Sequence, residues 1–284
     1  MIWLLLVSVV WAFSFGLIKG RLGGVDPSLV AFLRVLLALL VFAPLCRVRA
    51  VRPGTMALLA GIGAVQFGLM YVCYIAAFQS LAAYEVAALT IFTPVLVTLI
   101  HDALARRIRW AALAAALLAV VGAGIIVVDK PLGSARWTGV LLVQASNACF
   151  ALGQVAWRRW RLAHPAARDS EIFALLYAGA ALITLPFALP AASQVATLTP
   201  SQGLVLLYLG IIASGVCFFL WNRGAAQAGA ASLAVANNIK IPLSVAFSVW
   251  FFGESADLSR LVLGSAAIVA AGLLAEWSGR RKAA

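Results

Sequence analysis

The chain has 284 residues, of which 64% are hydrophobic and 11% charged, and its formal net charge is +12. Soluble domains are roughly 45–50% apolar and about 25% charged, so this composition excludes a soluble globular protein and indicates a chain that folds in lipid. The positive charge lies between the apolar runs, where it reports membrane topology and not a nucleic-acid partner.

Ten apolar runs are long enough to cross a bilayer, which takes about 20 residues per helix. The predicted spans, in chain order, are 2–19, 28–46, 55–78, 85–104, 110–128, 138–157, 170–189, 202–222, 233–252 and 259–276. The first has neither a charged leader nor a small-residue cleavage site, so we expect it to be a retained helix. The fold class predicted is an all-α integral membrane protein with ten transmembrane helices.

Lys and Arg are distributed unevenly over the loops. The loops after the even-numbered spans and the tail hold 14 of them, and the opposite loops hold 5. Because positive residues near helix ends stay cytoplasmic, both termini are predicted to be cytoplasmic, and the basic tail at 278–284 with them.

The two halves of the sequence resemble each other at a shift of 148 residues. The clearest matches pair Gln79 with Gln227, Pro94 with Pro242, and Gly124 with Gly272. Each half holds five crossings, and an odd number per half forces opposite orientations. The sequence therefore predicts a five-plus-five inverted repeat, with a first repeat at 1–130 and a second at 138–277.

Four segments carry a resemblance to a known family. They are WAFSFGLIKG (11–20), AFLRVLLALL (31–40), the segment 74–100 and the segment 225–254. They resemble the EamA-type members of the drug/metabolite transporter superfamily, and within it the aromatic amino acid exporters. The resemblance implies alternating access to a small-molecule substrate in the cytoplasmic (inner) membrane of a bacterium. The acidic residue that ends the last segment departs from the symmetry of the repeat. Glu254 maps to position 106 in the first half, but the acidic residue there is Asp102, four positions earlier.

Lys240 is the residue that most clearly indicates a site. It lies near the middle of the ninth span, where an unpaired cation costs about 2.5–3.5 kcal/mol or more. Asn237, Asn238 and Ser244 accompany it and would hold the polar end of a substrate, while its repeat mate is the apolar Phe92. Two alternatives remain: a structural Lys that reaches a carbonyl or water, and a Ser–Lys dyad with Ser244, which would make the protein a membrane-embedded hydrolase.

Aromatic and amide side chains complete the predicted cavity. Tyr74, Phe78 and Trp221 are expected to face the substrate's side chain, and Gln144 and Asn147 to provide polar partners in a wet cavity. The alternative for the aromatic residues is packing or interface anchoring. Arg34 lies about two turns from its helix end, so a structural, snorkelling role is favoured over a place in the cavity.

Pro94 and Pro242 occupy matched positions in the two halves. A proline inside a helix frees the carbonyl four residues earlier and kinks the helix, so the pair, with the glycine-rich stretch 61–68, suggests movable gates. The alternative is that membrane helices tolerate both prolines without moving.

The predicted function is export of aromatic or hydrophobic amino acids and similar small metabolites. A broad exporter of cationic drugs is the alternative within transport, and a positive cavity speaks against it. Neither the cysteines nor the histidines have a metal-ligand spacing, so no metal, cofactor or enzymatic activity is predicted, and the partners are a small molecule and the bilayer. No acidic residue is predicted at mid-span, which favours transport without an obligatory ion partner.

Overall fold

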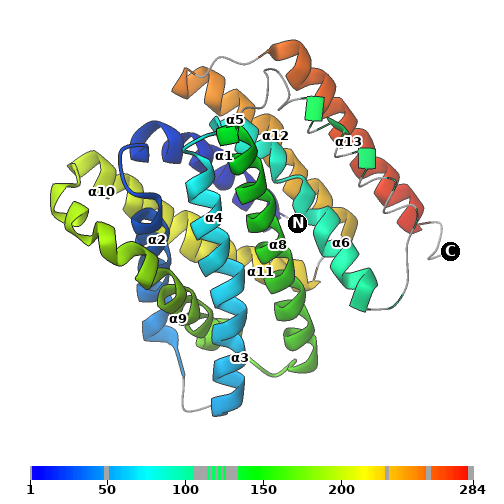
Figure 1. Cartoon of the computed structure of the whole chain (residues 1–284). Helices are drawn as coiled ribbons and strands as arrows, with labels where there is room; N and C mark the ends of the chain where they lie inside the picture. Colours follow the sequence, from blue (N-terminus) through cyan, green and yellow to red (C-terminus); the bar gives the residue numbers. More distant parts are fainter. Residues whose placement is uncertain are drawn as a thin grey trace.

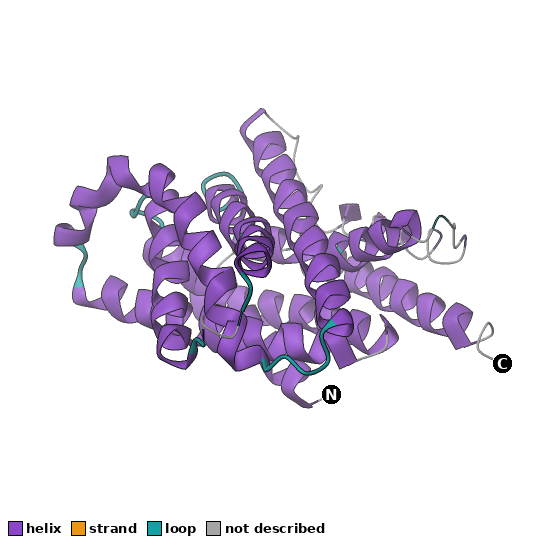
Figure 2. Cartoon of the chain, turned by 90° about the horizontal axis from the view of Figure 1, so that it is seen from below, coloured by secondary structure: helices purple, strands orange, loops and turns teal. Residues whose placement is uncertain are grey.

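The computed structural model describes residues 2–47, 51–104, 106, 110, 114, 117–118, 121–122, 124–125, 134–227, 230–253 and 257–280. In this part of the chain the elements are helices, without a strand (Figures 1 and 2). The all-α fold class is therefore confirmed. The fifth predicted span, 110–128, lies mostly outside the described residues, so the count of ten remains a prediction.

The helices follow the predicted spans closely. The first repeat contains α1 (Ile2–Leu22), α2 (Pro27–Phe42) with η1 (Ala43–Leu45), α3 (Pro53–Gly63) continued by η3 (Ala64–Leu69) and α4 (Met70–Ala77), and α5 (Ala83–Leu89) followed by α6 (Phe92–Leu104). The second contains α8 (Ser134–Ala163), α9 (Asp169–Ala188) with η4 (Leu189–Thr197), α10 (Pro200–Leu207) continued by η5 (Tyr208–Val216) and α11 (Cys217–Gln227), α12 (Ala230–Phe252) and α13 (Leu258–Arg280). Among the described residues, seven helical segments are long and apolar enough to cross a membrane.

The loops between helices carry the capping chemistry that their sequences suggest. The carboxylate of Asp26 accepts hydrogen bonds from the backbone N–H groups of Ser28 and Leu29 and so starts α2. Thr199 and Gln202 form a reciprocal capping box before α10. Each cap satisfies N–H groups that the first turn of a helix leaves without a partner.

The packing of the helices has the exchange symmetry of two related halves. α1 packs on α12 as α8 packs on α6, and α4 packs on α8 as α11 packs on α1. α3 and η3 pack on α9 in the same way as η5 packs on α2. α2 and α9 correspond to each other in the two halves, and they pack directly against each other. This reciprocity is what an inverted repeat produces, since exchanging the halves returns the same set of contacts.

α3 and α9 approach each other through a reciprocal pair of glycines. A Cβ atom added at Gly63 would lie 1.9 Å from the carbonyl oxygen of Leu176, and one added at Gly179 would lie 1.9 Å from that of Ala60. Small residues allow helix backbones to pack this closely in membranes.

Among the described residues, each half contains one π-helical segment, and the two lie at corresponding positions. The shift of 148 residues places η3 on 212–217, which overlaps η5. In η5 the hydroxyl of Ser214 donates to the carbonyl of Leu209, five residues earlier, and the hydroxyl of Tyr177 donates to the carbonyl of Ser214 at 2.5 Å. The stretch 61–68, predicted as a gate, thus contains most of η3. Such segments often accompany functional sites in helices.

The two matched prolines are not structurally equivalent. Pro94 lies in the first turn of α6, and the helix is interrupted just before it, at Thr90 and Ile91. α12 runs without interruption past Pro242, whose side chain lies outside the described ones. Of the two prolines, only Pro94 follows an interruption of the described helix, and a gating role of either proline remains a prediction.

Candidate functional site

A cavity lies among helices of both repeats. Its empty volume, counting the open space at its mouth, is about 560 Å³. Its lining residues are Trp11, Ser14, Phe15, Arg34, Met70, Tyr71, Tyr74, Thr90, Thr93, Ser146, Asn147, Phe150, Phe218 and Lys240. Two of them are cations and none of these described residues is acidic.

Lys240 enters the cavity from the middle of α12. Its side chain is buried, its Nζ donates to Oδ1 of Asn237 at 2.8 Å, and it lies 5.6 Å from the ring centroid of Trp11. An ammonium group has three donors, and Asn237 accepts one of them. The amide nitrogen of Asn237 is also buried without a hydrogen-bond partner among the described residues. Lys240 therefore keeps unused N–H donors on the cavity wall, whereas Asn237, which was predicted to bind the substrate, is not a lining residue.

Arg34 is a second buried cation on the cavity wall. The sequence favoured a structural role in which Arg34 snorkels to the end of its helix. In the structure Arg34 is only 2% exposed, so it does not reach the helix end. Its Nε donates to Oγ of Ser214 at 3.1 Å and its Nη2 to the hydroxyl of Tyr71 at 2.9 Å. Its Nη1 is buried and has no partner in the described structure. Arg34 is thus a site residue that the sequence interpretation did not select.

A chain of amides and hydroxyls links α6, α8 and the break before α6. Thr93 donates to Oδ1 of Asn147, whose amide nitrogen donates to the carbonyl of Leu89 at 2.9 Å and to Oε1 of Gln144 at 3.2 Å. Asn147 lines the cavity as predicted, whereas Gln144 lies behind it and fixes its orientation.

The apolar wall of the cavity is aromatic. Tyr74 lines it as predicted and packs edge-on against Phe15 and Phe78, with ring centroids 5.8 and 5.1 Å away. Phe78 and Trp221 are not lining residues, in contrast to the prediction. Trp221 packs behind Trp11 at 5.0 Å and donates to Oε1 of Gln154.

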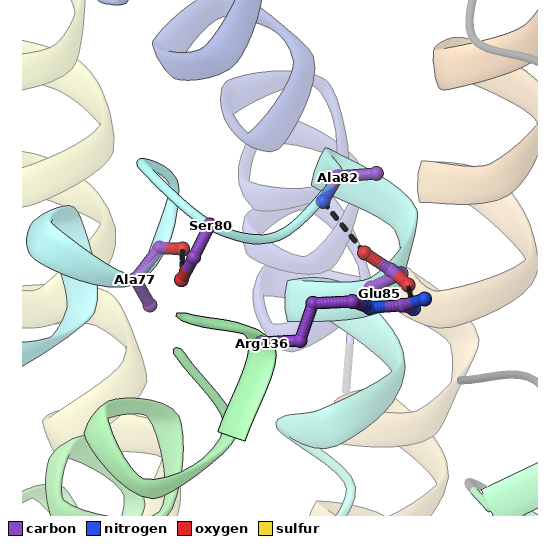
Figure 3. Close-up of polar contacts among 5 residues, drawn as sticks. All are labelled: Ala77, Ser80, Ala82, Glu85 and Arg136. Carbon is purple, nitrogen blue, oxygen red and sulfur yellow. Dashed lines mark hydrogen bonds and ion pairs between the residues drawn. The ribbon is translucent and has the colours of Figure 1, made fainter. Parts of the chain in front are cut away.

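Polar contacts close the bundle beyond the cavity, where α4 ends and α5 and α8 begin. Figure 3 shows the ion pair between Arg136 of α8 and Glu85 of α5, whose other carboxylate oxygen accepts from the backbone N–H of Ala82. At the same end Lys19 of α1 donates to the carbonyl of Phe78 at 2.6 Å. These contacts join four helices that belong to both halves.

Ser244 does not pair with Lys240. Its hydroxyl is directed to the carbonyl of Ala12 at 3.4 Å, and it is fully buried between α12 and α1. A serine nucleophile needs its base within hydrogen-bond reach, and here Lys240 donates to Asn237. The geometry therefore does not support the dyad. The side chain of Asn238 lies outside those that the structure describes.

Several lining residues escaped the sequence interpretation. Trp11, Ser14 and Phe15 lie on the first helix, whose aromatic and small residues resemble ordinary packing. A helical wheel places them on one face, and this face is the only signal that could have found them. Within the described residues, no three His, Cys, Asp or Glu side chains gather as a metal site requires.

The long apolar helices and the cavity between them are the features of a helical membrane protein with room for a small molecule. Residues 1–128 and again residues 137–275 match the family described as the EamA-like transporter family. The chain belongs to this family.

Several relatives have descriptions that name a substrate, which the family description does not. The chain is 42% identical over 283 residues to a probable biotin transporter of Pseudomonas aeruginosa, covering 99% of this chain and 98% of that protein. It is 37% identical to a biotin transporter of Salmonella typhimurium and 36% identical to one of Escherichia coli, each covering 94% of this chain and 90% of the relative. These descriptions do not confirm the predicted likeness to aromatic amino acid exporters. A solved structure of 22% identity superposes with a TM-score of 0.70 over 99% of both chains and supports the fold.

Proposed function

We propose that this protein carries biotin, or a carboxylate of similar shape, across the membrane. The observation that supports this most directly is the pair of buried cations, Lys240 and Arg34, on a cavity wall without a described acidic residue. A carboxylate supplies two acceptor oxygens and one negative charge, which together meet the unused donors and the buried ammonium group. The choice of biotin among carboxylates comes from the names of the relatives.

The charge of the cavity separates this proposal from export of aromatic amino acids. A zwitterionic amino acid brings an ammonium group together with its carboxylate. None of the described lining residues is acidic, while Arg34 and Lys240 are both cations. The ammonium group would enter low-dielectric surroundings beside like charges, which is costly. A monoanion without an amine avoids this cost, and the same argument disfavours cationic drugs.

Solute counterflow in proteoliposomes tests the proposal without assuming a direction of transport. Vesicles loaded with unlabelled biotin should accumulate labelled biotin transiently when they contain the protein. Loss of the charge-assisted hydrogen bond in Lys240→Met is expected to weaken apparent biotin affinity by about 10- to 100-fold, equivalent to about 1.5–3 kcal/mol. Arg223→Met is the matched control, since Arg223 is exposed at the end of α11 and away from the cavity.

Two results would contradict the proposal. Counterflow of phenylalanine or tryptophan without counterflow of biotin would return the function to amino acid transport. Equal biotin affinity in Lys240→Met and Arg223→Met would remove Lys240 from the binding site.

A further inference from the structure

The hydrogen bonds around Arg34 can be counted completely. Ser214 has one hydroxyl proton, which it donates to the carbonyl of Leu209 at 2.7 Å. Ser214 therefore accepts from both Nε of Arg34 and the hydroxyl of Tyr71, which lies 2.7 Å away. Tyr71 in turn accepts from Nη2 of Arg34. Of the five N–H groups of Arg34, one on Nε and one on Nη2 are used by these bonds, while Nη1 remains a buried nitrogen without an acceptor among the described residues, in a residue that lines the cavity.

A buried guanidinium nitrogen without an acceptor is expensive, since the penalty for leaving a charged group unsatisfied exceeds that for a neutral one. Arg34 makes no ion pair within the described structure, and no described acidic residue lines the cavity with it. The network holds the guanidinium in one orientation, so the unused donor is fixed and not free to seek water. Such a donor is suited to an acceptor that arrives with a ligand.

An aromatic wall separates this donor from the one at Lys240. Trp11 lies beside Lys240, Phe218 packs on Trp11 with ring centroids 4.8 Å apart, and Tyr71 packs edge-on against Phe218 at 5.8 Å. Arg34 follows, with its guanidinium carbon 4.3 Å from the Tyr71 ring centroid. A ligand that reached both cations would thus need polar groups at its two ends and an apolar body between them.

We infer that Arg34 is a specificity-determining residue that binds a neutral carbonyl oxygen at the end of the substrate opposite its carboxylate. In biotin this oxygen is that of the ureido ring, so the inference rests on the proposed function and deepens it. The proposed function assigns the substrate's carboxylate to Lys240. The neutral carbonyl oxygen at the other end of the substrate is then the acceptor left for the unused N–H groups of Arg34.

Competition against labelled biotin distinguishes the two ends of the ligand. Octanoate carries the carboxylate without a ureido group, and biotin methyl ester carries the ureido group without the charge. Arg34→Gln should weaken biotin by about tenfold or more and leave inhibition by octanoate unchanged. Lys240→Met should weaken both carboxylates and leave the methyl ester unchanged. Arg223→Gln is the matched control, because Arg223 is exposed and does not line the cavity, and it should leave the affinity for biotin and for octanoate unchanged.

The wild-type protein provides a second test that does not depend on the folding of a variant. In 2-iminobiotin the carbonyl oxygen is replaced by a nitrogen that is protonated near neutral pH, so Arg34 meets a cation and not an acceptor. We expect it to bind at least about tenfold more weakly than biotin. Equal binding of the two compounds, or an equal loss of biotin and octanoate in Arg34→Gln, overturns the inference and leaves the proposed function standing. Absence of biotin binding to the wild type overturns both.

Discussion

Replacing Gly63 by alanine should destabilise the protein through a single methyl group. In the structure this methyl carbon would lie 1.9 Å from the carbonyl oxygen of Leu176 and 2.4 Å from its Cα. Ordinary contact requires at least about 3 Å, so α3 and α9 would have to separate by about 1 Å. The atoms in the way belong to the backbone of a helix and cannot rotate aside. Overpacking of this kind costs about 1–3 kcal/mol, and we expect the upper part of that range.

Gly61→Ala is the matched control on the same helix. A methyl group at Gly61 meets nothing within 4 Å, so the better helix propensity of alanine should leave stability unchanged or raise it by up to about 1 kcal/mol. Unfolding of the purified protein in detergent micelles, followed by far-ultraviolet circular dichroism, measures both. Equal stability of the two variants would refute the close approach of α3 and α9.

Other consequences of the structure can be checked separately. Glu85→Gln removes the ion pair with Arg136 at the end of the cavity, which is worth about 1 kcal/mol. A cysteine placed at Ser146 should then react with maleimide about fivefold faster. An unchanged rate would mean that this contact does not close the cavity. Trp221→Phe keeps an aromatic ring against Trp11 and loses one hydrogen bond, so stability should fall by about 0.5–1.5 kcal/mol. The ratio of biotin to octanoate affinity should not change, and a changed ratio would place Trp221 in the site. In a cysteine-free background, Ser193→Cys should react with impermeant maleimide in intact cells and Ala166→Cys only after permeabilisation, and the reverse pattern would invert the predicted topology.

The helices could be predicted from the sequence because lipid imposes one strong rule on every crossing. Each apolar run must satisfy its backbone groups internally, so it forms a helix of nearly fixed length. The predicted spans 2–19 and 170–189 thus lie within or across α1 and α9 with ends that differ by a few residues. The break before Pro94 and the π-helical segments were less accessible, since they depend on contacts such as the one between Tyr177 and Ser214.

The cavity was predicted in part, for a physical reason that individual residues illustrate. Lys240 and Asn147 stand out in the sequence because a polar side chain at mid-span is costly to bury and usually has a functional role. Arg34 seemed able to reach the interface, and only its contacts with Tyr71 and Ser214 show that it turns inward. Trp221 and Phe78 lie one layer behind the wall because a helix face predicts which residues point inward and not how far another side chain covers them.

The paired π-helical segments also record an order of events in the history of the chain. A π segment holds an extra residue within its turn, so an insertion in an ancestral single-repeat gene would appear in both halves after duplication. η3 and η5 overlap at the repeat shift, whereas Lys240 corresponds to the apolar Phe92. The most economical history therefore places the helix irregularity before the duplication and the charged residue after it. On this history the ancestor already had the helix irregularity, and chemical selectivity arose later, through Arg34 in the first copy and Lys240 in the second.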